Sequence, residues 1–311
     1  MQCFFRVLTF YSNFAVYFLL KLKEMKNLLI TGSKGQLGNE LRLILETEQN
    51  KKLFRTYFTD IDSLDITDEV AVENFFNQHK IDFIINCAAY TAVDRAESNK
   101  ELCYKINTEA VKILVKEAKK HSVKIVQIST DYVFDGRNCK PYTEDDTTNA
   151  QSVYGSSKTD SEKFITDNYP ADSIIIRTSW LYSKFGGNFV KTMIRLGSER
   201  DSLNVVFDQI GTPTNAADLA GAIVDIVKSE KFIAGIYHYS NEGVCSWYDF
   251  AKEIMTAKGL KCKVNPILSC DYPTPATRPH FSLLDKQKIK TTYHIKIPHW
   301  RESLINTLKE L

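Results

Sequence analysis

The most informative stretch of the chain reads Leu28-Leu29-Ile30-Thr31-Gly32-Ser33-Lys34-Gly35-Gln36-Leu37-Gly38. A short apolar run predicts a buried strand, and three glycines spaced Gly-x-x-Gly-x-x-Gly predict a tight turn. Leu37, Leu41 and Leu45 then recur at helical spacing. A strand, a glycine turn and a helix in this order form a dinucleotide-binding fingerprint, in which the helix N-terminus faces the pyrophosphate. The glycines alone would also suit an ordinary turn, so the flanking pattern carries the prediction.

The rest of the chain continues the alternation of strands and helices, which predicts an α/β fold with a doubly wound, Rossmann-type parallel sheet. Expected strands cover residues 28–31, 52–59, 82–87, 124–129, 174–176, 203–207 and 235–239, and expected helices include 69–79, 107–121 and 159–168. We assign residues 25–178 mainly to the dinucleotide-binding domain. Residues 179–311 mainly form a smaller substrate-binding lobe, with the strands near 203–207 and 235–239 returning to the sheet.

Residues 1–24 precede the first expected strand and form an N-terminal extension. Their apolar run, 7–20, is shorter than the about 20 residues that span a bilayer, and no small-residue cleavage site follows it. Met25 lies where a domain of this type normally starts. We therefore expect an upstream extension or a misassigned start codon, and no membrane anchor.

Composition narrows the class of protein further. A net charge of +2 without a run of Lys or Arg gives no sign of nucleic-acid binding. The seven cysteines are scattered and contain no Cys-x-x-Cys, which predicts reduced thiols in a cytoplasmic protein. The six histidines form no recognisable ligand set, so no metal site is predicted from spacing.

A second motif, Tyr154-x-x-x-Lys158, places a phenol and an ammonium one helical turn apart on the same face. We expect the ammonium to lower the pKa of the phenol from its usual value near ~10 and to suit Tyr154 to acid–base catalysis. Asp60 ends the second expected strand, where a carboxylate can bind the 2′-hydroxyl of NADH. Lys34 could instead pair with the 2′-phosphate of NADPH, and Asp60 could be only a turn former, so the cofactor preference stays open.

Seven ordered segments carry a resemblance to known proteins: residues 31–38, 86–94, 129–136, 153–158, 177–180, 208–214 and 272–279. With them, the chain from residue 25 to the C-terminus resembles the extended short-chain dehydrogenase/reductases and, among these, the dTDP-4-dehydrorhamnose reductases. The resemblance implies hydride transfer from NADPH or NADH to the C4 ketone of dTDP-4-dehydro-L-rhamnose. It also implies that Tyr154 donates the proton, Lys158 lowers its pKa and binds the nicotinamide ribose, and Thr130 hydrogen-bonds the same oxygen.

The resemblance further implies two sets of binding residues. Cofactor contacts are expected at Gly32, Gly35, Gln36, Leu37, Gly38, Asp60, Asp65, Ile66, Ala88, Ala89, Tyr90, Thr91, Tyr154 and Lys158. Substrate contacts are expected at Thr130, Asp131, Trp180, Asn188, Lys191 and Arg278, with Arg278 on the diphosphate. Trp180 could equally be a core residue and Arg278 a surface residue. Some relatives form homodimers with Mg²⁺ held by interface carboxylates, for which Glu40 is the candidate here.

Three alternative functions remain at this point. A 4,6-dehydratase needs an Asp-Glu after the Thr of the fourth strand, whereas this chain has Asp131-Tyr132. A 4-epimerase usually carries a shorter turn than the one ending in Asp135-Gly136. A non-catalytic regulatory subunit resembling the β subunit of methionine adenosyltransferase is disfavoured by the joint presence of Thr130, Tyr154 and Lys158, without being excluded.

Overall fold

A six-stranded parallel sheet forms the centre of the molecule in the computed structural model, which describes residues 25–311. Its strand order is β10-β5-β4-β3-β1-β2, and every neighbouring pair is parallel. The strands are β1 (Lys26–Thr31), β2 (Phe54–Phe58), β3 (Phe83–Asn86), β4 (Lys124–Thr130), β5 (Ser173–Thr178) and β10 (Gly235–His238). The chain leaves β1 toward β2 on one side and returns to β3 on the other, so the order reverses beside β1. Ligands of doubly wound sheets bind at such a reversal.

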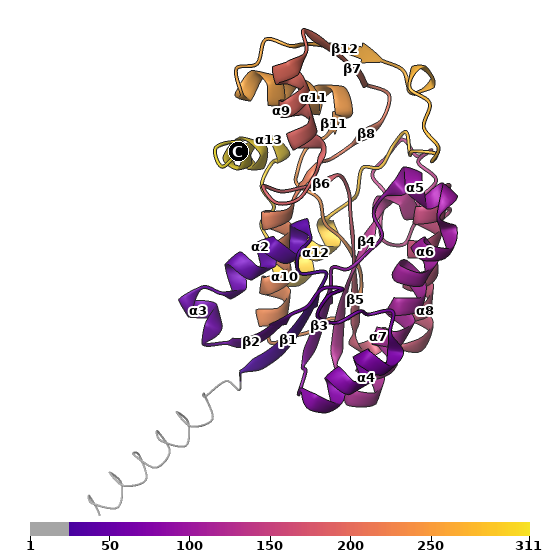
Figure 1. Cartoon of the computed structure of the whole chain (residues 1–311), viewed down its shortest axis with the longest axis vertical. Helices are drawn as coiled ribbons and strands as arrows, with labels where there is room; N and C mark the ends of the chain where they lie inside the picture. Colours follow the sequence, from indigo (N-terminus) through magenta and orange to yellow (C-terminus); the bar gives the residue numbers. More distant parts are fainter. Residues whose placement is uncertain (1–24) are drawn as a thin grey trace, which may run out of the picture.

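Helices cover both faces of this sheet (Figure 1). One face carries α2 (Gln36–Leu45) and α10 (Ala216–Lys228), and the other carries α4 (Glu69–Gln78), α7 (Ala110–His121) and α8 (Val153–Asn168). Successive strand residues point to opposite faces, so Leu28 and Ile30 pack toward α2 and α10 while Leu29 packs toward α4 and α7. A strand covered on both faces must be apolar throughout, which explains the continuous run that predicted β1. The predicted doubly wound fold is confirmed.

Short helices and turns connect these elements at both ends of the sheet. They are α3 (Glu48–Lys51), α5 (Val93–Ser98), α6 (Lys100–Tyr104) and the 3₁₀ turns Asp131–Val133, Pro170–Asp172 and Ser269–Asp271. The helix expected over 107–121 begins with a π-helical turn, Lys105–Glu109, before α7. The helix expected over 159–168 starts earlier, at Val153, because the Ser152 side chain accepts a hydrogen bond from Gly155 N at 3.1 Å and caps α8 there.

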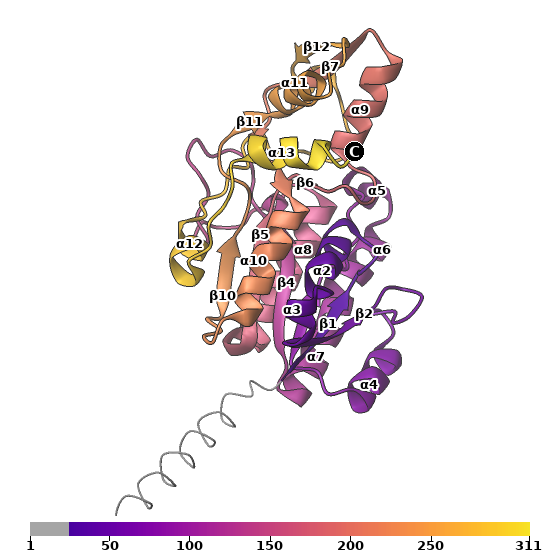
Figure 2. The same ribbon diagram turned by 90° about the vertical axis from the view of Figure 1, so that its left-hand side faces the viewer.

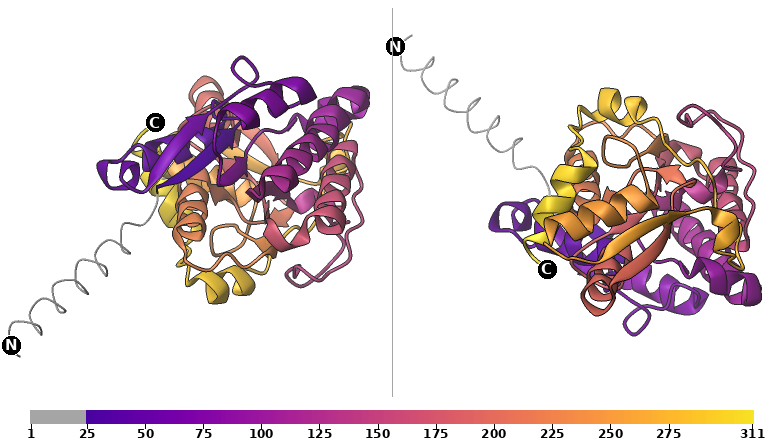
Figure 3. Two further views of the ribbon diagram at one scale, coloured as in Figure 1. Left: turned by 90° about the horizontal axis from the view of Figure 1, so that it is seen from below. Right: turned by 90° about the horizontal axis from the view of Figure 1, so that it is seen from above.

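The C-terminal lobe lies beyond the carboxyl ends of the central strands (Figure 2). It contains β6 (Leu181–Tyr182), α9 (Phe189–Glu199), β7 (Ser202–Val206), β8 (Ile210–Gly211), β9 (Thr214–Asn215), β11 (Cys245–Ser246), α11 (Trp247–Ala257), β12 (Lys263–Ile267) and α13 (Trp300–Leu308). The short helix α12 (Gln287–Tyr293) instead packs beside β10, where Ile289 joins the core of the central sheet. Seen along the length of the molecule, the helices lie on either side of the central strands (Figure 3).

One expected strand does not return to the sheet. The segment expected at 203–207 forms β7, which pairs with β12 in a separate two-stranded sheet. Leu203 and Val205 pack into the lobe core, but Ser202 and Asn204 between them are exposed. A strand with one solvent-exposed face is typical of the surface of a lobe, whereas a strand inside a parallel sheet is buried on both faces. The strand expected at 235–239 does join the sheet, as β10 beside β5.

No helix among residues 25–311 is long and apolar enough to cross a membrane. The expectation about residues 1–24 lies outside the described part of the chain. The division near residue 178 stays a proposal. α10 and β10, which follow that point in sequence, pack with the first domain.

Candidate active site

The glycine turn after β1 presses against the turn after β3. Gly32 has a φ of +62°, and a Cβ placed on it would lie 2.6 Å from the backbone nitrogen of Ala88. A Cβ on Gly38 would lie 2.5 Å from the carbonyl oxygen of Gly32. Both positions therefore require glycine. Gly35 caps α2 without a side-chain hydrogen bond, and the first turn of α2 holds no acidic residue, so its amides and dipole suit an anion.

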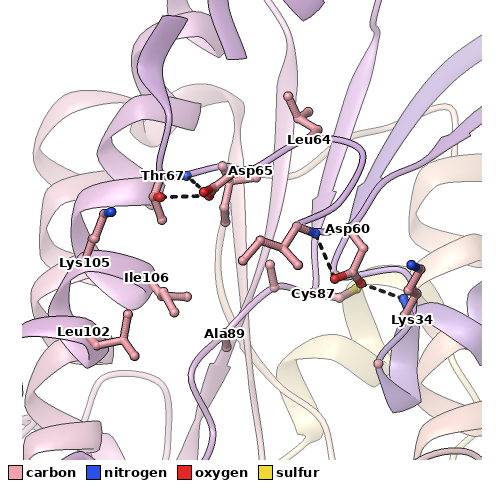
Figure 4. Close-up of a pocket in the computed structure, with 15 residues that line it drawn as sticks. Lys34, Asp60, Leu64, Asp65, Thr67, Cys87, Ala89, Leu102, Lys105 and Ile106 are labelled. Carbon is pink, nitrogen blue, oxygen red and sulfur yellow. Dashed lines mark hydrogen bonds between the residues drawn. The ribbon is translucent and has the colours of Figure 1, made fainter. Parts of the chain in front are cut away.

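A cavity of about 520 Å³ opens beside this turn (Figure 4). Asp60, at the end of β2, accepts hydrogen bonds from the backbone nitrogens of Lys34 and Ile61, each at 2.9 Å. The Lys34 ammonium pairs with Asp62 at 2.5 Å on the exposed side of the turn. The carboxylate is thus fixed in place, while the lysine is held by another carboxylate. Predicted cofactor residues that line this cavity are Gly32, Gly35, Asp60, Asp65, Ile66, Ala88 and Ala89.

Asp65 and Tyr90, two of the predicted cofactor residues, have clear structural roles. Asp65 Oδ1 accepts bonds from both the backbone nitrogen and the hydroxyl of Thr67, at 2.9 and 2.8 Å. Tyr90 does not line this cavity, and its backbone N and O are both hydrogen-bonded by the buried Asn107 side chain. Asn107 also donates to the Ser157 hydroxyl of α8 at 3.0 Å. It therefore joins the turn after β3 to the catalytic helix, a role that no local pattern in the sequence indicated.

A second cavity, of about 570 Å³, continues from the first and reaches the lobe. The two share Gly32, Gly35, Cys87, Ala88 and Ala89, so one groove runs along the carboxyl ends of the strands. Further predicted residues that line the second cavity are Gln36, Leu37, Gly38, Thr91, Thr130, Asp131, Tyr154, Lys158, Trp180 and Asn188. The structure thus brings together side chains from six separate segments.

Tyr154 and Lys158 lie in the first two turns of α8. Lys158 is buried, and its Nζ donates to the carbonyl oxygen of Ile128 at 2.6 Å. Burial lowers the pKa of Lys158 to about 8, against an opposing effect of Glu162. Burial also raises the pKa of Tyr154 above its ordinary value, and only a hydrogen bond with Thr130 lowers it.

The expected lowering of the Tyr154 pKa by Lys158 is therefore wrong for this arrangement. The Lys158 ammonium donates to the carbonyl oxygen of Ile128, and it is not among the groups that shift the pKa of the phenol. Burial raises the pKa of the phenol because it disfavours the charged phenolate. A raised pKa keeps Tyr154 protonated at neutral pH, which is the state that a proton donor needs.

Thr130 and Asp131 end β4 beside this pair. The Thr130 hydroxyl donates to Asp131 Oδ1 at 3.0 Å and accepts from Tyr132 N at 3.2 Å. Burial raises the pKa of Asp131 to about 6, and hydrogen bonds with Ser282 and Thr130 oppose this rise. Asp131 Oδ2 makes no hydrogen bond of ordinary geometry with any residue of the described chain. The Asp131 side chain lines the second cavity, but its Oδ2 is buried.

An ion pair that the sequence did not predict supports the floor of the site. Arg177 donates to Glu162 from Nε at 3.1 Å and from Nη2 at 2.7 Å, with both side chains buried. The Ser129 hydroxyl donates to the same carboxylate. These bonds connect β4, β5 and α8 directly below Thr130 and Lys158. Each partner comes from a different element, so only the folded chain reveals the network.

The predicted substrate residues divide into two groups. Trp180 and Asn188 line the second cavity, and Asn188 also donates to Gln36 Oε1 at 2.9 Å, which ties the lobe to the glycine turn. Lys191 and Arg278 line neither of the two cavities. Arg278 instead forms a two-pronged ion pair with Asp94 of α5, at 2.9 and 2.7 Å.

The expected Mg²⁺ finds no support in the described residues. Among residues 25–311 no group of three or more His, Cys, Asp or Glu side chains is placed to hold a metal ion. Glu40 is buried and accepts a hydrogen bond from the Ser183 hydroxyl at 2.6 Å. Its carboxylate therefore joins α2 to the lobe.

A doubly wound sheet, a glycine turn at its reversal and a Tyr–Lys pair in the adjoining groove define an extended short-chain dehydrogenase/reductase. The model of one family, the RmlD substrate binding domain, matches residues 25–311. The chain belongs to that family.

Named relatives agree with this assignment. The chain is 41% identical over 294 residues to the dTDP-4-dehydrorhamnose reductase of Aggregatibacter actinomycetemcomitans, covering 91% of this chain and 98% of the relative. A solved dTDP-4-dehydrorhamnose reductase from Clostridium acetobutylicum superposes with a TM-score of 0.87 at 43% identity, over 91% of this chain and 99% of the other. The Bacillus anthracis reductase, solved in complex with NADP, gives a TM-score of 0.87 at 38% identity, over 92% and 100%.

Proposed function

We propose that the protein reduces dTDP-4-dehydro-L-rhamnose to dTDP-L-rhamnose with NADPH or NADH. The observation that carries the proposal is the continuity of the groove. Its first cavity adjoins the glycine turn and Asp60, and its second holds Tyr154, Lys158 and Thr130. A dinucleotide laid along the strand ends would reach the Tyr–Lys pair, where a ketone can be reduced. Relatives that carry the reductase name over nearly their whole length support the choice of substrate.

The proposed chemistry needs a hydride at C4 of the sugar and a proton at its oxygen. When bound, the reduced nicotinamide supplies the hydride. Tyr154, protonated because its burial raises its pKa, donates the proton to the developing alkoxide. Thr130 lines the same cavity as Tyr154 and would hydrogen-bond the same sugar oxygen. Lys158, whose Nζ is held by the Ile128 carbonyl oxygen, would bind the nicotinamide ribose and would supply a positive charge to the cavity while it is protonated.

The binding residues follow from the same placement. The pyrophosphate would lie at the N-terminus of α2, with Gly32, Gly35 and Leu37 close to it. Asp60 would accept bonds from the adenosine ribose, and the NADP complex of the Bacillus anthracis relative supports a phosphorylated cofactor as an alternative. Asp131, which lines the second cavity, would contact a sugar hydroxyl. Arg278 would reach the diphosphate only by leaving Asp94.

Two properties of the working enzyme belong to the same proposal. We place it in the cytoplasm, supported by the six cysteines between Cys87 and Cys270, which form no disulfide. A homodimer stays a prediction, which sedimentation of the purified protein would test.

The direct test is oxidation of NADPH or NADH by the purified protein, followed at 340 nm while a 4,6-dehydratase and an epimerase generate the 4-keto sugar nucleotide. Turnover that depends on the sugar nucleotide supports the reductase. A protein that binds the cofactor, does not oxidise it and captures a methionine adenosyltransferase would instead be a regulatory subunit.

A further inference from the structure

The lobe contributes an aromatic wall to the catalytic cavity. Trp180 and Trp247 both line the cavity that contains Tyr154. Trp180 follows β5, whereas Trp247 is the first residue of α11, 67 positions later. The motif at 177–180 points to Trp180 as a substrate contact, but no motif or comparison gives Trp247 a role. The wall is therefore assembled from two segments, one of which has no assigned function.

The two indoles form a close parallel stack. Their ring centroids lie 3.7 Å apart with 12° between the planes, and Phe189 of α9 packs on Trp247 with a centroid distance of 4.6 Å. Both tryptophans are only partly buried. Because each also borders the cavity, the pair presents apolar surface to a ligand.

The backbone conformation at each tryptophan fixes the position of its indole. Ser246 and Asp249 form a reciprocal capping box that fixes the start of α11 and hence Trp247. Trp180 has a φ of +48°, a left-handed conformation that a bulky residue adopts only when its surroundings impose it. A Cβ on Gly211 would lie 3.0 Å from the Trp180 indole, so the chain leaves room for that ring. A strained residue fixed at a cavity wall is typical of a binding site arranged before its ligand arrives.

We propose that Trp247 is a substrate-binding residue, which together with Trp180 forms an indole pair that takes an apolar face of the sugar nucleotide. That face is either the C–H face of the deoxyhexose or the ring of the base, since both offer flat apolar surface to an aromatic wall. This inference rests on the proposed function, because it takes the sugar nucleotide as the ligand of the second cavity.

The stack has a spectroscopic signature of its own. The chain contains three tryptophans, and the third, Trp300, is buried in the lobe core beside Phe250. Two stacked indoles give an exciton couplet in the circular dichroism spectrum near 230 nm. We expect the couplet to disappear in Trp247→Leu and to persist in Trp300→Phe. This measurement shows that the variant has lost the stack while the far-UV spectrum shows that it is folded.

Binding is then measured by calorimetry with dTDP-L-rhamnose in the presence of NADP⁺. We expect Trp247→Leu to weaken the binding of dTDP-L-rhamnose at least tenfold, to leave NADP⁺ binding within twofold, and Trp247→Phe to recover most of the loss. Tyr248→Phe is the matched control, since Tyr248 packs on the lobe core and does not line the cavity. Titration with dTDP separates the two ligand faces: an equal loss for dTDP assigns the wall to the base, and an unchanged dTDP affinity assigns it to the sugar.

Affinity of Trp247→Leu for dTDP-L-rhamnose within twofold of wild type, with the couplet lost, would overturn the inference. Because calorimetry needs no turnover, this result differs from failure of the proposed reduction, which would appear as wild-type protein that binds the product and oxidises no cofactor.

Discussion

At the scale of single residues, burial determines the protonation states at the site. Tyr154 and Lys158 occupy the same groove, and desolvation acts on both in the direction that favours the uncharged form. For the phenol this is the protonated donor. For the lysine it places the loss of charge near pH 8, within the range in which the enzyme can be assayed.

The pH dependence follows from that value. Lys158 is charged below its pKa of about 8 and neutral above it, so kcat/KM should fall as the pH rises through about 8. Lys158→Arg should move this alkaline limb to higher pH, because a guanidinium stays charged in proteins. Initial rates between pH 6 and 10 measure both effects. A wild-type profile that stays level to pH 10 would contradict the assignment.

Some of these residues could be predicted from the sequence and others could not. Tyr154 and Lys158 share a helix face because of their spacing, and Gly32 and Gly38 follow a buried strand, so local patterns identify them. The pKa of Tyr154 depends on what covers it, which spacing does not encode. Asn107 and Trp247 act through contacts with Tyr90 and Trp180, far away in the sequence.

At the scale of elements, close packing between the glycine turn and α2 positions the cofactor. The Cβ of Gly38→Ala would lie 2.5 Å from both the Gly32 carbonyl oxygen and Ser33 Cα, so α2 must move. We expect NADPH to bind at least tenfold more weakly, measured by fluorescence titration.

The matched control for this prediction lies in α10. A Cβ on Gly221 meets nothing within 4 Å, so Gly221→Ala should leave NADPH affinity unchanged and stabilise the helix by about 1 kcal/mol. Equal NADPH affinity in Gly38→Ala and Gly221→Ala would show that the turn does not depend on this contact.

The position of strand β7 differs from the one that its sequence predicts. Strand β7 was expected in the central sheet because its apolar residues resemble those of a strand. The sequence Ser202 to Val205 alternates polar and apolar residues, and in the structure these residues are alternately exposed and buried. That alternation indicates a strand at the lobe surface. The partner strand, β12, lies some 60 residues later, a pairing that no local window could reveal.

At the scale of the whole molecule, polar contacts join the lobe to the dinucleotide-binding domain at several places, including Ser183–Glu40 and Asn188–Gln36. The Asp94–Arg278 ion pair is one of them, and both side chains are partly exposed, at 39% and 27%. Because solvent screens the charges, we expect a coupling energy of about 1 kcal/mol despite the two-pronged geometry.

A double-mutant cycle with Asp94→Asn and Arg278→Gln, measured by urea unfolding, tests this value. A salt titration is the control, since the coupling should shrink as ionic strength rises. Additive effects of the two substitutions would mean that the pair does not hold the two parts of the chain together.

The measurement that bears most directly on the function is the turnover of Tyr154→Phe. This change removes the proton donor and keeps the ring that packs in the groove, so NADPH should bind within about threefold of wild type. Oxidation of NADPH with the 4-keto sugar nucleotide should fall by about 10²–10⁴-fold, the usual contribution of a positioned acid. Turnover within tenfold of wild type, with the cofactor bound normally, would show that another group protonates the sugar oxygen.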